Sequence, residues 1–158
     1  RGKYFNDGPR HCKISLAPTA PGSGICPVCH KPLTIGVAHR IEQLADRCTQ
    51  EAENYFQPFQ YILPLPEILS EVMGFNDAGK AVKKKYTQAI SRFGNEFDML
   101  LRTPIADIHR FHPTLSLAID RLRRDEKRVI PGYDGEHGRV RFFDGDELQR
   151  KPEQTTLF

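Results

Sequence analysis

Residues 26–31 read Cys-Pro-Val-Cys-His-Lys, and this stretch decides how the first part of the chain folds. Two cysteines separated by two residues form a tight knuckle that points both thiolates at one place. Cys12 lies upstream and His39 downstream, so four ligands can close around a single Zn²⁺ ion. Closed sites with tetrahedral sulfur and nitrogen ligands are structural rather than catalytic. The sequence therefore predicts a zinc-knuckle (treble-clef-like) module with one structural zinc, bound by Cys12, Cys26, Cys29 and His39.

Two residues compete for the fourth ligand position. His39 falls on the first turn of an expected helix, whereas Cys48 lies nine residues further on, roughly 13 Å along a helix that rises 1.5 Å per residue. This distance favours His39, and Cys48 then lines up with the apolar residues of that helix as a small buried side chain. His11 and His30 flank the cysteines, and we expect them to be exposed or to support the ligands. A disulfide or free thiols are the alternative for the whole cluster.

Length and composition limit what the chain does. Its 158 residues are enough for one ordinary core with a small metal-bound module. The sequence contains no apolar run near 18 residues and no signal peptide, so no membrane partner is expected. Cysteines used to hold a metal fit a reducing cytoplasm. The net charge of +3 is compatible with nucleic acid but too small to argue for it alone. The first residue is Arg1 rather than methionine, which indicates a fragment of a longer protein.

The pattern of apolar residues predicts a mostly α-helical chain with small β elements. The expected division is a zinc module at 1–50, a helical domain at 51–128, a short β element at 129–146 and a flexible tail at 147–158. In the β element, 129–130 and 139–143 are expected to form a hairpin-like pair joined by a glycine-rich turn at 131–135. In the zinc module, a strand at 33–37 precedes a helix that ends at Asp46. The helices expected after it cover 67–73, 77–93, 97–101, 104–109 and 113–124.

Signals at the helix ends support these boundaries. Pro66 suits a first helical turn, Gly74 ends the same helix, and Asp77 is expected to cap the long helix that follows it. The apolar stripe of that long helix is Val82, Tyr86, Ala89, Ile90 and Phe93. The last helix is expected to bury Leu115, Leu117, Ala118, Ile119 and Leu122.

Basic residues gather in two places that could contact phosphates. The denser run is Lys80, Lys83, Lys84 and Lys85, and the second is Arg121, Arg123 and Arg124. Lysine and arginine supply the phosphate contacts that position a protein on DNA. A solvated helix face is the commoner explanation of such runs. DNA is therefore a candidate partner, with these seven side chains as candidate contacts.

Several stretches, taken in order, resemble the C-terminal zinc-binding and helical part of endonuclease Q-like proteins. They are Gly2-Lys-Tyr4, Cys26-Pro-Val-Cys29, Lys31-Pro-Leu-Thr-Ile-Gly36, His39-Arg-Ile-Glu-Gln-Leu-Ala-Asp-Arg47, Leu63-Pro-Leu-Pro-Glu-Ile68, Phe93-Gly-Asn-Glu-Phe-Asp98, Leu100-Leu-Arg102 and Pro131-Gly-Tyr-Asp-Gly135. That family joins an N-terminal PHP (polymerase and histidinol phosphatase) domain to a zinc module and a helical domain. The resemblance implies DNA repair by cleavage of the strand beside a deaminated base such as uracil or hypoxanthine.

The chain departs from the family in one important respect. PHP domains hydrolyse with a metal cluster held by several His, Asp and Glu residues, and the chain contains no His-x-His pattern. We therefore expect the catalytic centre to lie upstream, outside this chain, and expect this part to recognise DNA without activity of its own. The alternatives are a zinc-stapled protein-interaction module with no DNA role, and an independent enzyme that uses His109 and His112.

The last five residues, Gln154-Thr-Thr-Leu-Phe158, resemble the motif with which bacterial repair proteins dock on the DNA polymerase sliding clamp. The residues before them are polar and include Pro152, so the tail is expected to be mobile. Gln154 would fix the register, and Leu157 and Phe158 would enter a groove of the clamp. The alternative is that Leu157 and Phe158 fold back onto the core of this chain.

Overall fold

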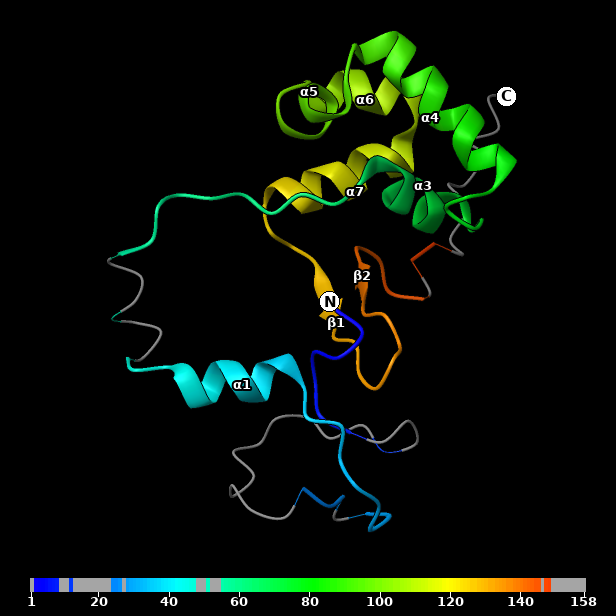
Figure 1. Cartoon of the computed structure of the whole chain (residues 1–158). Coiled ribbons are helices and arrows are strands. Elements are labelled where there is room, and N and C mark those ends of the chain that lie inside the picture. The colour runs from blue at the N-terminus through cyan, green and yellow to red at the C-terminus, as the bar shows by residue number, and fades with distance from the viewer. Residues whose placement is uncertain are drawn as a thin grey trace. The chain divides into compact units, whose positions relative to one another are not determined.

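The computed structural model describes residues 2–8, 12, 24–26, 28–47, 51, 55–145 and 147–148. The chain divides into two compact units (Figure 1). The first consists of Arg1–Pro58 with Val129–Val140, and the second of Phe59–Arg128 with Arg141–Phe158. The expected mostly helical chain with a small β element is confirmed.

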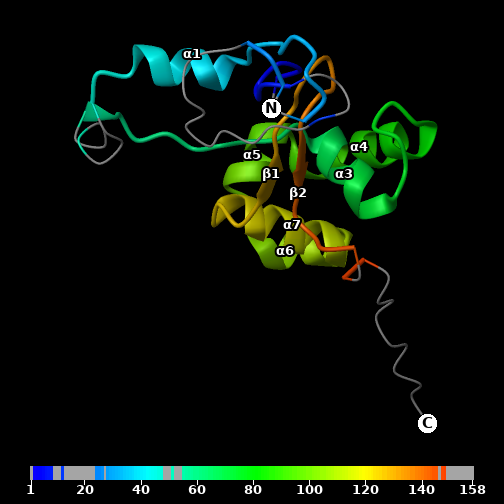
Figure 2. The same cartoon turned by 90° about the horizontal axis from the view of Figure 1, so that it is seen from below.

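Helices α3 to α7 form the second unit, and they stay together in both views (Figure 1 and Figure 2). Their bounds are α3 Leu65–Met73, α4 Lys80–Phe93, α5 Glu96–Leu101, α6 Ile105–Phe111 and α7 Pro113–Arg123. Helix α3 ends as predicted, because Gly74 adopts the left-handed conformation with φ 69°. Helix α4 begins later than predicted. Asp77 accepts a hydrogen bond from the Ala78 amide, and the turn from Asn76 to Gly79 delays the helix until Lys80.

The core of this unit lies where α7 packs against α3, α5 and α6. Its fully buried large side chains include Leu65, Ile68, Leu69, Val82, Met99, Leu100, Ile108, Leu115 and Ile119. The predicted stripe of α4 faces inward, with Val82 and Ala89 completely buried. One expectation for α7 is wrong: Leu117 is half exposed, because it lies on the face turned away from the residues at 115, 118, 119 and 122.

A buried carboxylate fastens the segment after the second strand to α3. Glu71 accepts hydrogen bonds from the amides of Phe142 (3.0 and 3.2 Å) and Phe143 (3.2 Å). Arg121 donates to the Phe142 carbonyl and forms an ion pair with Glu147 at 2.9 Å. Its guanidinium also lies 4.8 Å from the Phe143 ring centre. Both phenylalanines are buried as a result.

Helix α1, Val37–Leu44, lies in the first unit, and the N-terminal segment caps it. The amides of Val37 and Ala38 donate to the carbonyls of Tyr4 (2.7 Å) and Phe5 (3.0 Å). The Gly36 amide donates to the Asp7 carboxylate at 2.6 Å. A side chain at Gly36 would collide with the Phe5 and Asn6 backbone, 2.5 Å from its Cβ. Close backbone approach therefore requires glycine here.

The β element is a two-stranded sheet, β1 Arg128–Ile130 and β2 Arg139–Arg141, close to the predicted hairpin. Between the strands, Tyr133 and Glu136 exchange backbone hydrogen bonds around Asp134 and Gly135. Both central residues have positive φ (36° and 88°), as an Asp-Gly hairpin turn requires. This turn agrees with the turn expected from the sequence.

The strand predicted at 33–37 does not form. Pro32 and Thr34 make only isolated bridges, to Ile25 and Gly8 respectively. The following residues already belong to the helix entry at Gly36 and Val37, so no continuous ladder develops. Within the part of the chain that the structure describes, no helix is long and apolar enough to cross a membrane.

Candidate metal centre and nucleic-acid surface

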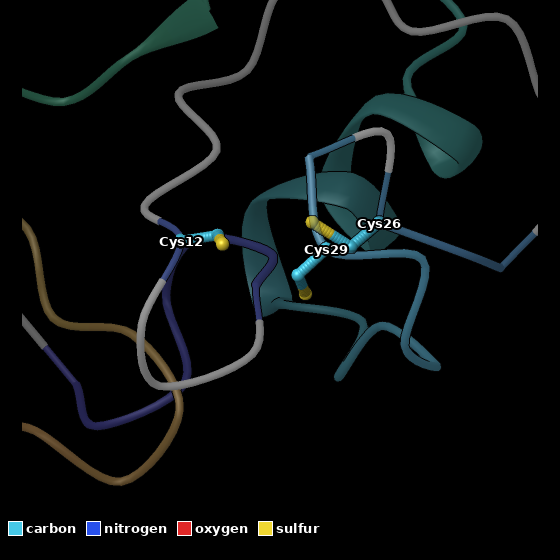
Figure 3. A group of neighbouring side chains, drawn as sticks. All are labelled: Cys12, Cys26 and Cys29. Atoms are coloured by element: carbon cyan, nitrogen blue, oxygen red, sulfur yellow. The ribbon is translucent and has the colours of Figure 1, made fainter.

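Three cysteine side chains converge in the first unit (Figure 3). The sulfur atoms of Cys12, Cys26 and Cys29 all lie within 4.8 Å of one another. Cys26 and Cys29 come from one loop and Cys12 from a separate stretch of chain. All three are free thiols, so the disulfide alternative does not apply to them.

The backbone of the knuckle explains why two of the thiols share one side. The Cys26 amide donates to the Lys31 carbonyl (2.8 Å), and the His30 amide donates to the Cys26 carbonyl (2.9 Å). The Val28 amide points at the Cys26 sulfur at 3.4 Å. His30 takes a left-handed conformation with φ 56° to close the turn. The loop is thus folded tightly around the sulfur atom of Cys26.

The thiols influence one another's ionisation. Burial, followed by hydrogen bonds to the other two thiols, raises the pKa of Cys12 to about 11. Burial also opposes ionisation of Cys26, but the hydrogen bonds donated to its sulfur outweigh this effect and lower the pKa of Cys26. Cys26 is thus favoured over Cys12 as a thiolate, the form that binds metals.

The three cysteines fit Zn²⁺. A tetrahedral zinc with Zn–S bonds of about 2.3 Å separates its sulfur ligands by roughly 3.8 Å. Sulfur atoms within 4.8 Å of one another need to move only slightly to reach that separation. Three thiolates suit zinc and other thiophilic ions, and not hard cations such as Mg²⁺ or Ca²⁺. The residues present can therefore hold a metal ion with three ligands.

His39 lies outside this group of cysteines. Its Nδ1 atom is 3.2 Å from the Asp7 carboxylate, which is buried and also binds the Gly36 amide. Histidines that bind zinc through Nε2 commonly donate Nδ1–H to a carboxylate in this way. No local motif in the sequence marks this role of Asp7. Cys48 and His11 lie outside the described residues.

The expected basic surface is present on α4. Lys80, Lys83 and Lys84 are exposed, and none of them forms an ion pair with a described carboxylate. The helix contains no acidic residue from Lys80 to Phe93. A shallow hollow on the same helix is lined by Lys84, Thr87, Gln88, Ser91 and Arg92. This face offers cations and hydrogen-bond donors that no neighbouring carboxylate neutralises.

The other predicted phosphate contacts have partners within the second unit. Lys85 stacks over the Phe111 ring at 4.0 Å. Arg123 donates to the carbonyls of Met99 (2.9 Å), Leu100 (2.8 Å) and Thr103 (2.7 Å), which satisfies the end of α5. Arg121 is held by Glu147, and Arg124 pairs with Asp120 at 2.6 Å. Lys80, Lys83 and Lys84 are therefore the predicted contacts whose side chains have no partner among the described residues.

The paired histidines have local roles in the helical unit. His109 Nδ1 lies 3.1 Å from the hydroxyl of the buried Ser116. His112 accepts a hydrogen bond from the Leu115 amide at 3.2 Å and so caps α7. Burial, together with the charge of Lys85, lowers the pKa of His112. Neither ring belongs to a cluster of metal-binding groups among the residues that the structure covers.

The predicted clamp-binding residues, Gln154, Leu157 and Phe158, lie outside the described residues.

Part of the helical unit matches a known family model. Residues 64–126 match the family model described as the MJ0043 C-terminal domain. An uncharacterised protein of Methanocaldococcus jannaschii, MJ0043, is 27% identical over 132 residues. That alignment covers 84% of this chain and 17% of the relative.

Two solved structures similar to this chain are both endonuclease Q enzymes. The lesion-specific endonuclease PfuEndoQ from Pyrococcus furiosus superposes with a TM-score of 0.77 and 29% identity, covering 96% of this chain and 38% of that one. The structure of endonuclease Q in complex with a 27-mer duplex substrate, with an abasic lesion at the active site, superposes with a TM-score of 0.73 and 27% identity. This match covers 99% of this chain and 39% of that one. The resemblance to endonuclease Q is thereby confirmed. The chain spans less than two fifths of the endonuclease Q chains.

Proposed function

We propose that this chain is the DNA-recognition part of an endonuclease Q-like repair nuclease. The observation that carries the proposal is the likeness, over nearly the whole chain, to an endonuclease Q captured on a duplex substrate. The unpaired lysines of α4 provide a physical reason, because phosphate contacts by such cations supply most of the affinity of non-specific DNA binding. Lys80 and Arg92 are separated by roughly 18 Å along the helix, enough to follow a strand over several phosphates.

Salt dependence tests the DNA role. Each lost phosphate contact lowers the slope of log K against log salt by about 0.9 on duplex DNA. Replacing Lys80, Lys83 and Lys84 with alanine should therefore flatten the slope by up to roughly 2.7. The matched control is Arg102→Ala with Arg110→Ala. Both arginines are exposed but paired with aspartates at 2.8 and 2.9 Å, so the slope should hardly change. An equal change of the salt slope in the lysine variant and in the arginine control would contradict the proposal that α4 contacts DNA phosphates.

The proposal extends to the parent protein. In it, a PHP domain outside this chain would nick the strand beside a deaminated base, as the family resemblance implies, while this chain positions the DNA. The purified chain should then bind DNA weakly and leave it uncut with Mg²⁺, Mn²⁺ or Zn²⁺ added. Metal-dependent nicking that survives repurification would locate catalysis in these residues instead.

The metal is proposed to be one structural zinc on Cys12, Cys26, Cys29 and His39. Asp7 supports the choice of His39 because it engages Nδ1 and leaves Nε2 available. A reducing cytoplasm would keep the thiols available for the ion. Elemental analysis of His39→Ala and Cys48→Ser variants decides the fourth ligand. Zinc lost only in Cys48→Ser would replace His39 with Cys48.

The C-terminal residues are proposed to tether the protein to the DNA polymerase sliding clamp. Burial of Leu157 and Phe158 would contribute at most about 2–3 kcal/mol each, less the cost of ordering the tail, which suits a micromolar tether. A labelled peptide of residues 150–158 should bind purified clamp and lose binding after Leu157→Ala with Phe158→Ala. Unchanged binding of that variant, or none by the native peptide, ends the proposal.

A second function, a zinc-stapled protein-interaction module, draws support from α1. Val37, Ile41 and Leu44 share one face of the helix and are each more than half exposed. Exposed apolar stripes of this kind mark contact surfaces. Zinc retention without any salt-dependent DNA binding would favour this function over the first.

A further inference from the structure

Two aromatic rings stand out on the surface of the second unit just before α3. Phe59 and Tyr61 lie in an extended segment, and 65% and 56% of their surfaces are exposed. Large aromatic side chains of soluble proteins are usually buried to a greater extent. Exposure of two such rings in one short segment is typical of a ligand-binding surface.

Each ring has a neighbour that fixes its position: the two rings contact each other, and a lysine contacts Tyr61. Their centres lie 5.1 Å apart in an edge-to-face arrangement with an interplanar angle of 88°. The ammonium group of Lys127 lies 4.4 Å from the centre of the Tyr61 ring, and Asp125 pairs with that ammonium. One face of Tyr61 is thus supported by a cation, while more than half of its surface stays accessible. A prepositioned ring loses little conformational entropy when a flat ligand stacks on it.

We propose that Phe59 and Tyr61 form a stacking platform for unpaired nucleobases of single-stranded DNA. This inference rests on the proposed DNA-binding function and adds a site to it. Every base has a flat π face, so aromatic rings bind unpaired bases with little regard to sequence. Duplex DNA keeps its bases stacked inside the helix and would not use the platform.

The cation over the Tyr61 ring suits a nucleic acid better than an apolar protein partner, because Lys127 keeps an ammonium beside the exposed ring while Asp125 pairs with it. Arg128 follows Lys127 directly and is exposed, with Asp144 3.5 Å away as its ion-pair partner. Aromatic rings accompanied by cations match a ligand that alternates flat bases with phosphates.

Substitutions that separate stacking from hydrophobicity test the site. Phe59→Leu and Tyr61→Leu keep an apolar side chain but remove the π face, whereas Tyr61→Phe keeps the ring. Binding to a fluorescein-labelled oligothymidine is measured by anisotropy, in parallel with a duplex of the same length. We expect each leucine variant to weaken single-strand binding about tenfold. Tyr61→Phe should bind like the native chain, and duplex binding should change less than twofold in all three.

Phe97→Leu is the matched control, because Phe97 is 61% exposed on α5 and belongs to no aromatic pair among the described residues. It should leave single-strand binding unchanged. Native affinity of both leucine variants for the oligothymidine would overturn the platform and leave a protein contact as the role of the rings. An equal loss on duplex and single strand would overturn it too. Failure of the native chain to bind either DNA would instead refute the proposed function itself.

Discussion

His30 occupies the position where the cysteine knuckle turns back on itself. Its φ of 56° lies in the left-handed region, which costs a residue other than glycine about 1–2 kcal/mol. Its amide donates to the Cys26 carbonyl, so the turn cannot relax without opening the knuckle. The side chain is exposed and lies outside the cysteine group. The strained backbone of His30 therefore helps to hold the candidate metal site in shape.

We expect His30→Gly to strengthen metal retention. Relief of the strain, offset by the greater freedom of glycine in the unfolded chain, should stabilise the loaded knuckle by roughly 0.5–1 kcal/mol. The chelator concentration that removes half of the zinc should rise about two- to fivefold, followed with a colorimetric zinc indicator. His30→Val should lower this chelator concentration, because a β-branched residue tolerates positive φ poorly. Loss of zinc from His30→Gly would show that the imidazole is a ligand.

Two buried carboxylates show what the sequence does not reveal at this scale. Asp7 accepts the Gly36 amide in the first unit, and Glu71 accepts two consecutive amides, Phe142 and Phe143, in the second. Each joins segments that are 29 or about 70 residues apart. No periodicity or local motif marks such a residue, because its partner is backbone that any sequence supplies.

At the scale of elements, α7 depends on a titratable cap. His112 accepts the Leu115 amide through Nδ1, a role that requires the neutral ring. Burial and the charge of Lys85 lower its pKa in the folded protein below the ordinary 6.5. The unfolded chain therefore takes up the proton first as pH falls. The stability that the cap contributes is fully present above pH 6.5 and is lost as pH falls through the folded pKa.

This predicts a difference between the native chain and His112→Asn. Asparagine is a good N-cap that does not titrate, so the variant should match the native stability at pH 7.5 within about 0.5 kcal/mol. Between pH 6.5 and 5 the native chain should lose up to about 1 kcal/mol more than the variant, measured by urea unfolding of the helical unit. His137→Asn is the control, because His137 is exposed and lies in the other unit. Parallel pH profiles of native and His112→Asn chains would contradict the cap mechanism.

For the whole molecule, the two units have different sources of stability. The helical unit buries a core of large apolar residues. The first unit buries few: Cys26, Ala38 and Tyr133 are its buried apolar side chains among the described residues, while most of α1 is exposed. A unit with so small a core needs a metal or another covalent or coordinate link to fold stably.

If the proposed zinc is bound, its removal should unfold the first unit and leave the helical unit folded. With chelator, amide exchange should accelerate at Val37 and Ala38, whose hydrogen bonds hold the N-terminal segment on α1. The amides of Met99 and His112 in the helical unit should keep their protection. Hydrogen exchange with mass spectrometry measures both. In a Cys26→Ser, Cys29→Ser variant the chelator should have no further effect, and simultaneous unfolding of both units in the native chain would refute this division.

Local signals in the sequence determined much of this protein. The Cys-x-x-Cys spacing located the knuckle, Gly74 marked the end of α3, and Asp134-Gly135 marked the hairpin turn, because each depends on conformations of neighbouring residues. The 3.6-residue pattern of α4 predicted its buried stripe for the same reason.

Only the tertiary structure decided which groups meet across the chain. It placed Cys12 beside the knuckle and the Asp7 carboxylate beside His39 and the Gly36 amide. It also made Arg123, one of the candidate DNA contacts, a hydrogen-bond donor to the end of α5. It exposed Leu117 and left the side chains of Lys80, Lys83 and Lys84 without partners in the part of the chain that the structure describes. These outcomes depend on the packing of distant segments. A charged or apolar residue has the same local pattern whether its partner is solvent, backbone or another side chain, so the pattern alone does not distinguish them.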